Sequence, residues 1–309
     1  MPKDRKQAGA KPAARGQSQA HAAAATSQSL SSQQRQQQEA QQPPAWPIFK
    51  PTLPVSDLSL DTIVPGKVVV LHNFFPRSLC RDYVAFLKTL PLVTTPARPK
   101  KGEAVRQNDR FQVNDPDFAA RLWLQTGLKE ALTGKPGDDY DDDDDDTADG
   151  RLGLWGGDVV GLSPNIRVYR YTKGQHFAPH YDDSNTLTLD PPPTRPQDAG
   201  TNSNSSTISK PPSVAVRTTW TLLLYLTGTA GGDDQCSGGE TVFYPNDRVS
   251  RKEEIAVAPQ TGLLLLHKHG NDCMLVSFTP DDLGDATILF AYFSRLTRGW
   301  HTARGKRSD

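Results

Sequence analysis

The chain has 309 residues, of which 36% are hydrophobic, and its formal net charge is zero. A chain of this length can build one sizeable core, or a core with unfolded segments attached, and the mean hydropathy of −0.58 favours the second arrangement. No apolar run approaches the roughly 20 residues that a membrane-spanning helix needs, and the first residues lack the apolar segment of a secretory signal. The sequence therefore predicts a soluble protein of the cytoplasm or nucleus, without a membrane partner. Its three cysteines are too few for a disulfide framework, which fits a reducing compartment.

The N-terminal tail, residues 1 to about 45, is rich in Ala, Gln and Ser and shows no hydrophobic periodicity. A segment of this composition buries too little apolar surface to fold, so it is predicted to be disordered. Its excess of basic residues would suit nucleic-acid binding or a nuclear address. A solvated tail is the simpler interpretation, and nucleic acid is not an expected partner.

The first predicted elements of the folded part are a strand and two helices. An apolar, β-branched strand covers residues 68–71, directly after a Pro65-Gly66 turn. A helix with Ser78 as its N-cap should follow, and a second helix should begin at Asp115-Pro116. Their apolar residues recur at helical spacing: Leu79, Tyr83, Phe86, Leu87 and Leu90 in the first, and Phe118, Ala119, Leu122 and Trp123 in the second. Both helices are expected to cover a sheet.

Two insertions and a series of short strands make up the next part of the chain. An acidic segment at residues 137–150 and a segment rich in Pro, Ser, Thr and Asn at residues 185–212 are predicted to be loops. The acidic run lacks the spaced ligands and the glycine of an EF-hand, so no calcium site is expected there. Strands are predicted at residues 166–171, 218–226, 241–244, 255–257 and 263–266. Many short strands separated by turns indicate a sandwich or jelly roll.

The most informative feature for function is the tripeptide His180-Tyr181-Asp182. On an extended strand, residues two apart point to the same face, so this imidazole and this carboxylate can bind one metal ion together. A second histidine from elsewhere would complete the two-histidine, one-carboxylate triad of non-haem iron oxygenases, which leaves open positions on Fe(II). A single His-x-Asp pair is weak evidence by itself, because it also arises by chance.

The surroundings of this tripeptide strengthen the interpretation. A strand at residues 165–171 and a Gly174-Gln175 turn precede it, and a long aliphatic strand and Gly238-Gly239-Glu240-Thr241 follow it. This ordered set resembles the prolyl 4-hydroxylase alpha-subunit type of Fe(II)/2-oxoglutarate-dependent dioxygenases, and most closely its fungal members. The resemblance runs from about Val64 to Leu275. It implies a mainly β, double-stranded β-helix (jelly-roll) domain with flanking helices, α+β overall, over residues 46–275.

The resemblance also implies a set of site residues and cofactors. His180 and Asp182 would be metal ligands, Tyr171 would hydrogen-bond the 2-oxoglutarate, and Thr241 would line the same pocket. The alternatives are that Tyr171 is a strand tyrosine packed in the core and that Thr241 was selected for β-propensity. The implied cofactors are Fe(II), the cosubstrate 2-oxoglutarate and L-ascorbate, with O2 as oxidant. The implied reaction is hydroxylation of a side chain in a protein or peptide substrate.

The pattern breaks after Leu275. The family continues there with a His-Glu-Gly segment that carries the distal iron ligand, whereas this chain reads Val276-Ser277-Phe278. The Lys or Arg that the family pairs with the far carboxylate of 2-oxoglutarate is also missing, near Ala286. Val-Ser can be encoded by GTGAGT or GTAAGT, the form of an intron donor, so we expect a truncated or mis-spliced C-terminus. Residues 276–309 are then an unmatched tail.

Three histidines of the C-terminal part are candidates to replace the distal ligand: His267, His269 and His301. The first two lie on a strand that the family places before the ligand, and the third lies in the unmatched tail. All three are expected to be ordinary strand or tail histidines. The chain is therefore expected to bind iron weakly and to turn over little, and a non-catalytic binding protein on the same fold is the alternative. A cupin-like metal enzyme independent of 2-oxoglutarate is a third possibility, which would require a replacement ligand.

Overall fold

The computed structural model describes residues 42–49, 53, 58–95, 101, 103–133, 153–189, 213–229, 236–244, 253–271, 273–277 and 285–296. The chain divides into two units, Met1–Gln42 and Pro43–Asp309, and the helices and strands given below all belong to the second. The predicted disorder of the N-terminal tail falls almost wholly outside the described residues, and the acidic segment 137–150 falls wholly outside them. None of the described helices is both long enough and apolar enough to cross a membrane.

The described strands form two antiparallel sheets. The large sheet has ten strands, in the order β1 (Ser59–Val64), β2 (Val68–His72), β12 (Leu264–Lys268), β9 (Val214–Tyr225), β14 (Ala286–Leu296), β6 (Asn165–Tyr171), β4 (Asp109–Asn114) and β3 (Val93–Thr94), with β5 (Val159–Leu162) beside β14 and β8 (Thr186–Leu189) beside β9. The small sheet has four strands, in the order β11 (Ile255–Val257), β10 (Thr241–Tyr244), β13 (Met274–Ser277) and β7 (Phe177–His180).

The path of the chain between the sheets identifies the fold. From β6 onward it passes from the large sheet to β7 in the small one, back to β9, out to β10 and β11, back to β12, out to β13 and back to β14. Two facing antiparallel sheets connected in this alternating way form a double-stranded β-helix, or jelly roll. The predicted fold class is therefore confirmed. The six strands predicted from the sequence correspond to β2, β6, β9, β10, β11 and β12.

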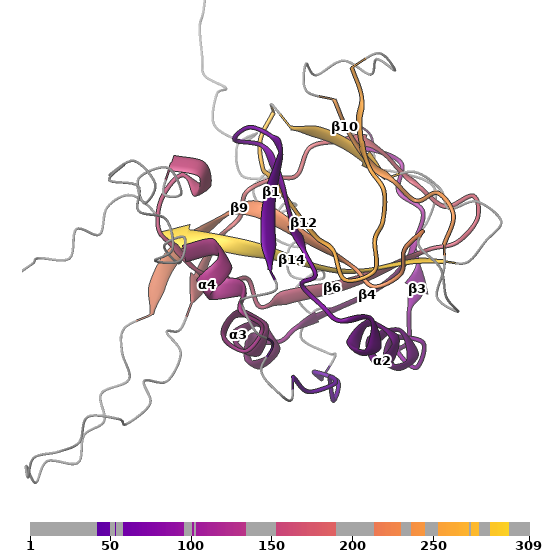
Figure 1. Cartoon of the computed structure of the whole chain (residues 1–309), viewed down its shortest axis with the longest axis horizontal. Helices are drawn as coiled ribbons and strands as arrows, with labels where there is room; N and C mark the ends of the chain where they lie inside the picture. Colours follow the sequence, from indigo (N-terminus) through magenta and orange to yellow (C-terminus); the bar gives the residue numbers. More distant parts are fainter. Residues whose placement is uncertain are drawn as a thin grey trace, which may run out of the picture. The chain divides into compact units, whose positions relative to one another are not determined.

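The large sheet is covered on both faces, and its sequence shows why. In β2, Val69 and Leu71 pack into the core beneath the helices, whereas Val68 and Val70 pack against residues of the small sheet. Because successive strand residues point to opposite faces, an uninterrupted apolar run suits a strand buried on both sides. Figure 1 shows α2 and α3 on one side of the large sheet and β10 on the other.

The helices follow the predicted apolar faces, with one correction at a helix start. The helix α3 (Pro116–Leu124) begins where the sequence predicted, and the side chain of Asp115, its N-cap, accepts from the Phe118 N–H. The helix α2 (Arg77–Leu87) instead begins one residue before Ser78, because Pro76 is its N-cap and no side chain caps it. A proline in extended conformation sets the helix start without a hydroxyl acceptor. A third helix, α4 (Leu128–Thr133), contacts α3.

The turn into β12 requires a glycine. Gly262 has φ of 86°, and a Cβ built there would lie 2.1 Å from the carbonyl oxygen of Phe75. The Phe75 N–H donates to the Gly262 carbonyl at 3.2 Å, so the backbones are held in contact. This close approach fixes the start of the strand that carries His267 five residues later.

Two segments expected to lie outside the sheets contribute strands. The predicted loop at residues 185–212 contains β8, which pairs with β9 from Thr186 to Leu189. The predicted tail contains β14, which lies between β9 and β6 in the large sheet. Neither expectation allowed for these strands, because a strand's partners lie far away in sequence and the local pattern does not show them. The remainder of both segments lies largely outside the described residues.

Candidate functional site

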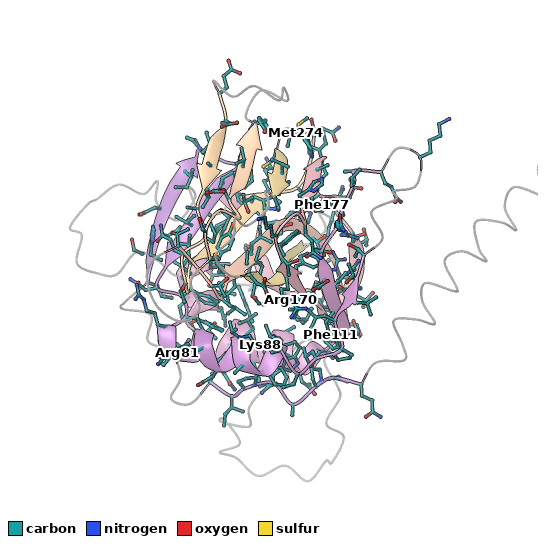
Figure 2. All side chains as sticks on the ribbon, turned by 90° about the vertical axis from the view of Figure 1, so that its right-hand side faces the viewer. Arg81, Lys88, Phe111, Arg170, Phe177 and Met274 are labelled. Atoms are coloured by element: carbon teal, nitrogen blue, oxygen red, sulfur yellow. The ribbon has the colours of Figure 1, made fainter. Side chains whose placement is uncertain are left out.

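His180 and Asp182 lie at the end of a strand, facing the interior between the sheets. His180 is the last residue of β7 and is paired with Leu275 of β13, while Asp182 lies two residues further on. The ring of Phe177 stacks on the His180 imidazole, with ring centroids 3.5 Å apart and an interplanar angle of 16°. Figure 2 marks this part of the small sheet by Phe177 and Met274, and Arg170 lies below them. The two sequence-predicted ligands are therefore neighbours.

The hydrogen bond made by His180 fixes which of its nitrogens is free. Its Nδ1 lies 2.8 Å from the carbonyl oxygen of Ala178, which can only accept, so Nδ1 carries the proton. The unprotonated Nε2 lies 3.7 Å from Oδ1 of Asp182. Burial lowers the pKa of His180, more than the Asp182 carboxylate raises it, so the imidazole stays neutral. A neutral imidazole whose distal N–H is bound to a carbonyl is typical of a metal-binding histidine.

The carboxylate of Asp182 is oriented by a hydrogen-bonded chain from the large sheet. The Thr221 hydroxyl donates to Asp182 Oδ2 at 2.5 Å, and the oxygen of that hydroxyl lies 3.0 Å from Nε2 of His269. Since Thr221 has one proton and gives it to the carboxylate, His269 must donate to Thr221. Burial lowers the pKa of His269 to about 4, so this donor is a neutral imidazole. The chain runs from His269 through Thr221 to Asp182.

The ionisation of Asp182 is favoured despite its burial. Burial alone would raise its pKa, but His267, His180 and the Thr221 hydroxyl together lower it. The backbone also holds the segment in place, because the Gly270 N–H donates to the Asp182 carbonyl at 3.2 Å. The site therefore presents an ionised carboxylate beside a neutral imidazole, which is the donor chemistry that suits Fe(II).

A further histidine lies against the same carboxylate. His267, on β12, is fully buried, and its Nε2 lies 3.5 Å from Asp182 Oδ2. Its neighbour across the strand pair is Thr221, the residue that hydrogen-bonds Asp182. Within the described part of the chain, no group of three or more His, Cys, Asp or Glu side chains already has the geometry of a metal site. His180, Asp182 and His267 are close together without yet converging on one point.

Tyr171 and Thr241, the residues expected at the cosubstrate, lie deeper between the sheets. Tyr171 is buried, and burial raises the pKa of its phenol although hydrogen bonding with Asn108 and Ser277 opposes this. Thr241 is fully buried and its hydroxyl lies 2.7 Å from that of Tyr225 on the opposite sheet. Both predicted residues therefore face the interior. The hydroxyl of Thr241 is already hydrogen-bonded there.

The position expected to hold a cation lies beside Tyr171. Ala286, at the start of β14, is the register partner of Tyr171 and is buried in the same cluster. A different cation approaches from another element, because the Arg106 guanidinium lies 5.1 Å from the ring centre of Phe177 and 6.0 Å from that of Tyr169. Burial lowers the pKa of His180 and raises that of Tyr171, and the charge of Arg106 has a smaller lowering effect on both. Arg106 is thus within electrostatic range of both halves of the site.

Sequence reasoning missed several of these residues. Thr221 gives no local signal, since a threonine in an apolar strand is explained by β-propensity alone. His267 and His269 share a strand face two residues apart, which was a signal, but their strand was expected to end before the ligand position. Arg106 belongs to a segment whose contact with β7 is a single bridge to Phe177. Each of these residues reaches the site through strand pairing between segments that are far apart in the sequence.

Solved structures similar to this chain include prolyl hydroxylases. The viral collagen prolyl hydroxylase vCPH of Paramecium bursaria Chlorella virus-1, in its 2OG complex, has a TM-score of 0.42 and 13% identity, over 74% of this chain and 97% of that one. A Pseudomonas putida prolyl-4-hydroxylase has a TM-score of 0.40 and 15% identity, over 75% and 94%. A Trichoplax adhaerens prolyl hydroxylase, solved with a hypoxia inducible factor peptide fragment, has a TM-score of 0.40 and 13% identity, over 74% and 83%.

The sequence comparisons add no family. No protein-family model matches the chain, and no curated protein matches it. The chemistry of the site therefore rests on this chain's own residues.

Proposed function

We propose that this protein is an Fe(II)- and 2-oxoglutarate-dependent dioxygenase that hydroxylates a side chain of a protein or peptide. The observation that carries the proposal is the state of His180 and Asp182. One imidazole has its Nδ1–H bound to a carbonyl and its free Nε2 turned towards a carboxylate that a hydroxyl orients. A buried arrangement of this kind is costly to form unless a cation uses it.

The residues present fit a bound iron and its cosubstrate in part. His180 Nε2 and Asp182 would hold the metal, and the Tyr171 phenol would donate a hydrogen bond to the anionic 2-oxoglutarate. When bound, iron and 2-oxoglutarate supply the oxidation of a C–H bond by O2, coupled to decarboxylation of the cosubstrate. The high pKa of Tyr171 keeps its proton available for donation at neutral pH. L-ascorbate as reductant follows from the sequence resemblance alone.

Arg106 would provide the positive charge that the family takes from its last strands. Its guanidinium makes no hydrogen bond or ion pair with another residue in the described ranges, and it is half-buried beside Phe177 and Tyr169. A planar guanidinium that lies next to a buried phenol, and has no carboxylate partner among the described residues, is suited to bind a carboxylate ligand. The far carboxylate of 2-oxoglutarate is such a ligand.

Apolar side chains around the two ligands would exclude water from the reacting centre. Leu275 of β13 is paired with both His180 and Phe243, and the Phe243 ring lies 5.6 Å from that of His267. Water exclusion strengthens the electrostatic interactions inside the site and prevents side reactions. The chain's own residues thus bind, orient and shield, while the chemistry belongs to the bound groups.

A second candidate function, a non-catalytic binding protein, is favoured by two observations. The hydroxyl of Thr241 is already engaged by Tyr225, and the position opposite Tyr171 is occupied by Ala286, which carries no charge. Both would weaken cosubstrate binding. The substrate class, peptidyl proline or another protein side chain, rests on the sequence resemblance to prolyl 4-hydroxylases.

Anaerobic loading with Fe(II), followed by 2-oxoglutarate and O2, separates the two candidates. We expect slow formation of succinate that requires both Fe(II) and 2-oxoglutarate and disappears in His180→Ala. The substitution His72→Ala, at a partly exposed histidine of β2 that pairs with Asp61 of the edge strand β1, should leave the rate unchanged. If the protein binds Fe(II) but forms no succinate above the protein-free reaction, the binding-protein alternative is correct.

A further inference from the structure

His267 is the one buried imidazole in this region whose role is not explained by a hydrogen bond. Its side chain has no exposed surface, and neither ring nitrogen has a hydrogen-bond partner among the described residues. A buried polar group without a partner costs about 1–3 kcal/mol, so a sequence keeps one only where something else uses it. The nearest charged group is the Asp182 carboxylate, 3.5 Å from Nε2.

We infer that His267 is the third protein ligand of the metal site, in place of the distal histidine that the sequence pattern leads one to expect after Leu275. This inference rests on the proposed function, since it completes the site of His180 and Asp182. The ligand set would then be two neutral imidazoles and one carboxylate, with the second imidazole supplied by the large sheet. A set of two imidazoles and one carboxylate suits Fe(II) and also Co(II), Ni(II) and Zn(II).

The distances are compatible with one shared ion. Ligand atoms bound at about 2.1 Å to a common metal lie about 3.0 Å apart at a right angle and about 3.4 Å apart at the tetrahedral angle. In the structure, the nearest Asp182 oxygen lies 3.7 Å from His180 Nε2 and 3.5 Å from His267 Nε2. The two imidazoles approach different oxygens of the same carboxylate, so a small rotation of that carboxylate and of the rings would bring the three donors together.

The strand register holds His267 in this position. His267 of β12 is paired with Thr221 of β9, and Thr221 donates to Asp182 from the same face. Two side chains adjacent across a strand pair are about 5 Å apart, so both reach a carboxylate placed above them. His269, two residues along the same face, completes the contact by donating to Thr221. One face of β9 and β12 is therefore built around Asp182.

The two described residues directly after Leu275, Val276 and Ser277, offer no imidazole to the site. Leu275 faces His180 from the interior cluster, whereas Val276 belongs to a separate cluster with Val242 and Tyr244 on the other face of the small sheet. Ser277, the next interior residue, is hydrogen-bonded with Tyr171. Among the described imidazoles near Asp182, those of His180 and His267 each have an Nε2 that no hydrogen bond engages, whereas the Nε2 of His269 is bound to Thr221.

Metal titration of the purified chain tests the inference without relying on turnover. Anaerobic calorimetry with Fe(II), and with Co(II) as an air-stable probe whose visible absorption reports its ligands, would compare the wild type with His267→Leu, His180→Ala and His72→Ala. We expect His267→Leu and His180→Ala each to weaken binding by about 100-fold or more, since loss of a residue that merely orients a ligand already costs about 10- to 100-fold. His72→Ala should bind like the wild type.

Thermal unfolding separates a ligand from a structural residue. Because His267 has no hydrogen bond to lose, His267→Leu should unfold without metal at the same temperature as the wild type or higher, yet gain nothing from added Co(II). If His267→Leu binds metal like the wild type while His180→Ala does not, the inference is wrong and the site at His180 stands. If the wild type binds no metal, both the inferred ligand role of His267 and the proposed function fail. If the wild type and the variants behave as expected but no succinate forms, the ligand set is upheld and the proposed dioxygenase activity fails.

Discussion

Replacing Thr221 by valine tests how the Asp182 carboxylate is held. The substitution keeps the shape of the side chain and removes the hydroxyl that donates to Asp182 Oδ2 at 2.5 Å and accepts from His269 at 3.0 Å. A hydrogen bond to a charged group contributes about 1.5–3 kcal/mol, and the His269 donor left unpaired adds to the loss. The free energy of unfolding of the metal-free protein should therefore fall by about 2–4 kcal/mol.

Metal affinity should fall as well, because the carboxylate would lose its orientation. Outer partners of metal ligands typically affect affinity by roughly 10- to 100-fold, which corresponds to about 1.4–2.7 kcal/mol. This range agrees with the strength of the hydrogen bond that is removed. Calorimetric titration with Co(II) and urea unfolding measure the two effects on the same variant.

The matched control lies two residues away on the same strand. The Thr219 hydroxyl is buried and has no hydrogen-bond partner among the described residues, so Thr219→Val removes a hydroxyl without removing an interaction. It should leave the metal affinity unchanged and should not lower the free energy of unfolding. The reasoning is refuted if Thr221→Val binds Co(II) as tightly as Thr219→Val does.

Two further substitutions probe the cosubstrate and the support of the site. Arg106→Met should weaken binding of 2-oxoglutarate to the metal-loaded protein by about 10-fold or more while leaving the metal affinity within about twofold, because a charge-assisted hydrogen bond contributes about 1.5–3 kcal/mol; equal weakening of both would contradict a role at the cosubstrate. Asp109→Asn removes the carboxylate that Arg170 binds at 2.7 Å and should cost roughly 2 kcal/mol at pH 7. Burial opposes the ionisation of Asp109, but hydrogen bonds from Thr94, Arg170 and Gln175 lower its pKa overall. A lowered folded-state pKa means that this stability is present above the unfolded value of about 3.9 and is lost as the pH falls through the folded value. Urea unfolding should thus show the wild type and Asp109→Asn converging below about pH 4, and a constant difference at all pH values would count against the ion pair.

The parts of the fold that the sequence predicted are those determined by local chemistry. The start of α3 was predicted correctly because it is determined within one turn, where the Asp115 side chain accepts from a backbone N–H three residues away. The start of α2 was wrong by two residues, because Pro76 and not Ser78 is its N-cap. The strand β14 was missed because its place in the sheet depends on β6 and β9, the nearer of which ends about 60 residues earlier in the chain.

The candidate site shows the same division between local and distant information. His180 and Asp182 were recognised because their spacing alone brings two donors together. His267 was not predicted as a ligand, because the family pattern puts its strand before the ligand position. Only the register of β12 against β9 brings it to Asp182. The role of Thr221 depends on a contact that spans 39 residues of sequence. Such contacts become visible only when the sheets are assembled.

The measurement that tests the central claim most directly is anomalous diffraction from a crystal grown anaerobically with Co(II) or Fe(II). The account predicts a single anomalous peak at bonding distance, about 2.0–2.2 Å, from His180 Nε2, an Asp182 oxygen and His267 Nε2. A peak elsewhere on the protein, or an interior without any peak between these three side chains, would contradict it.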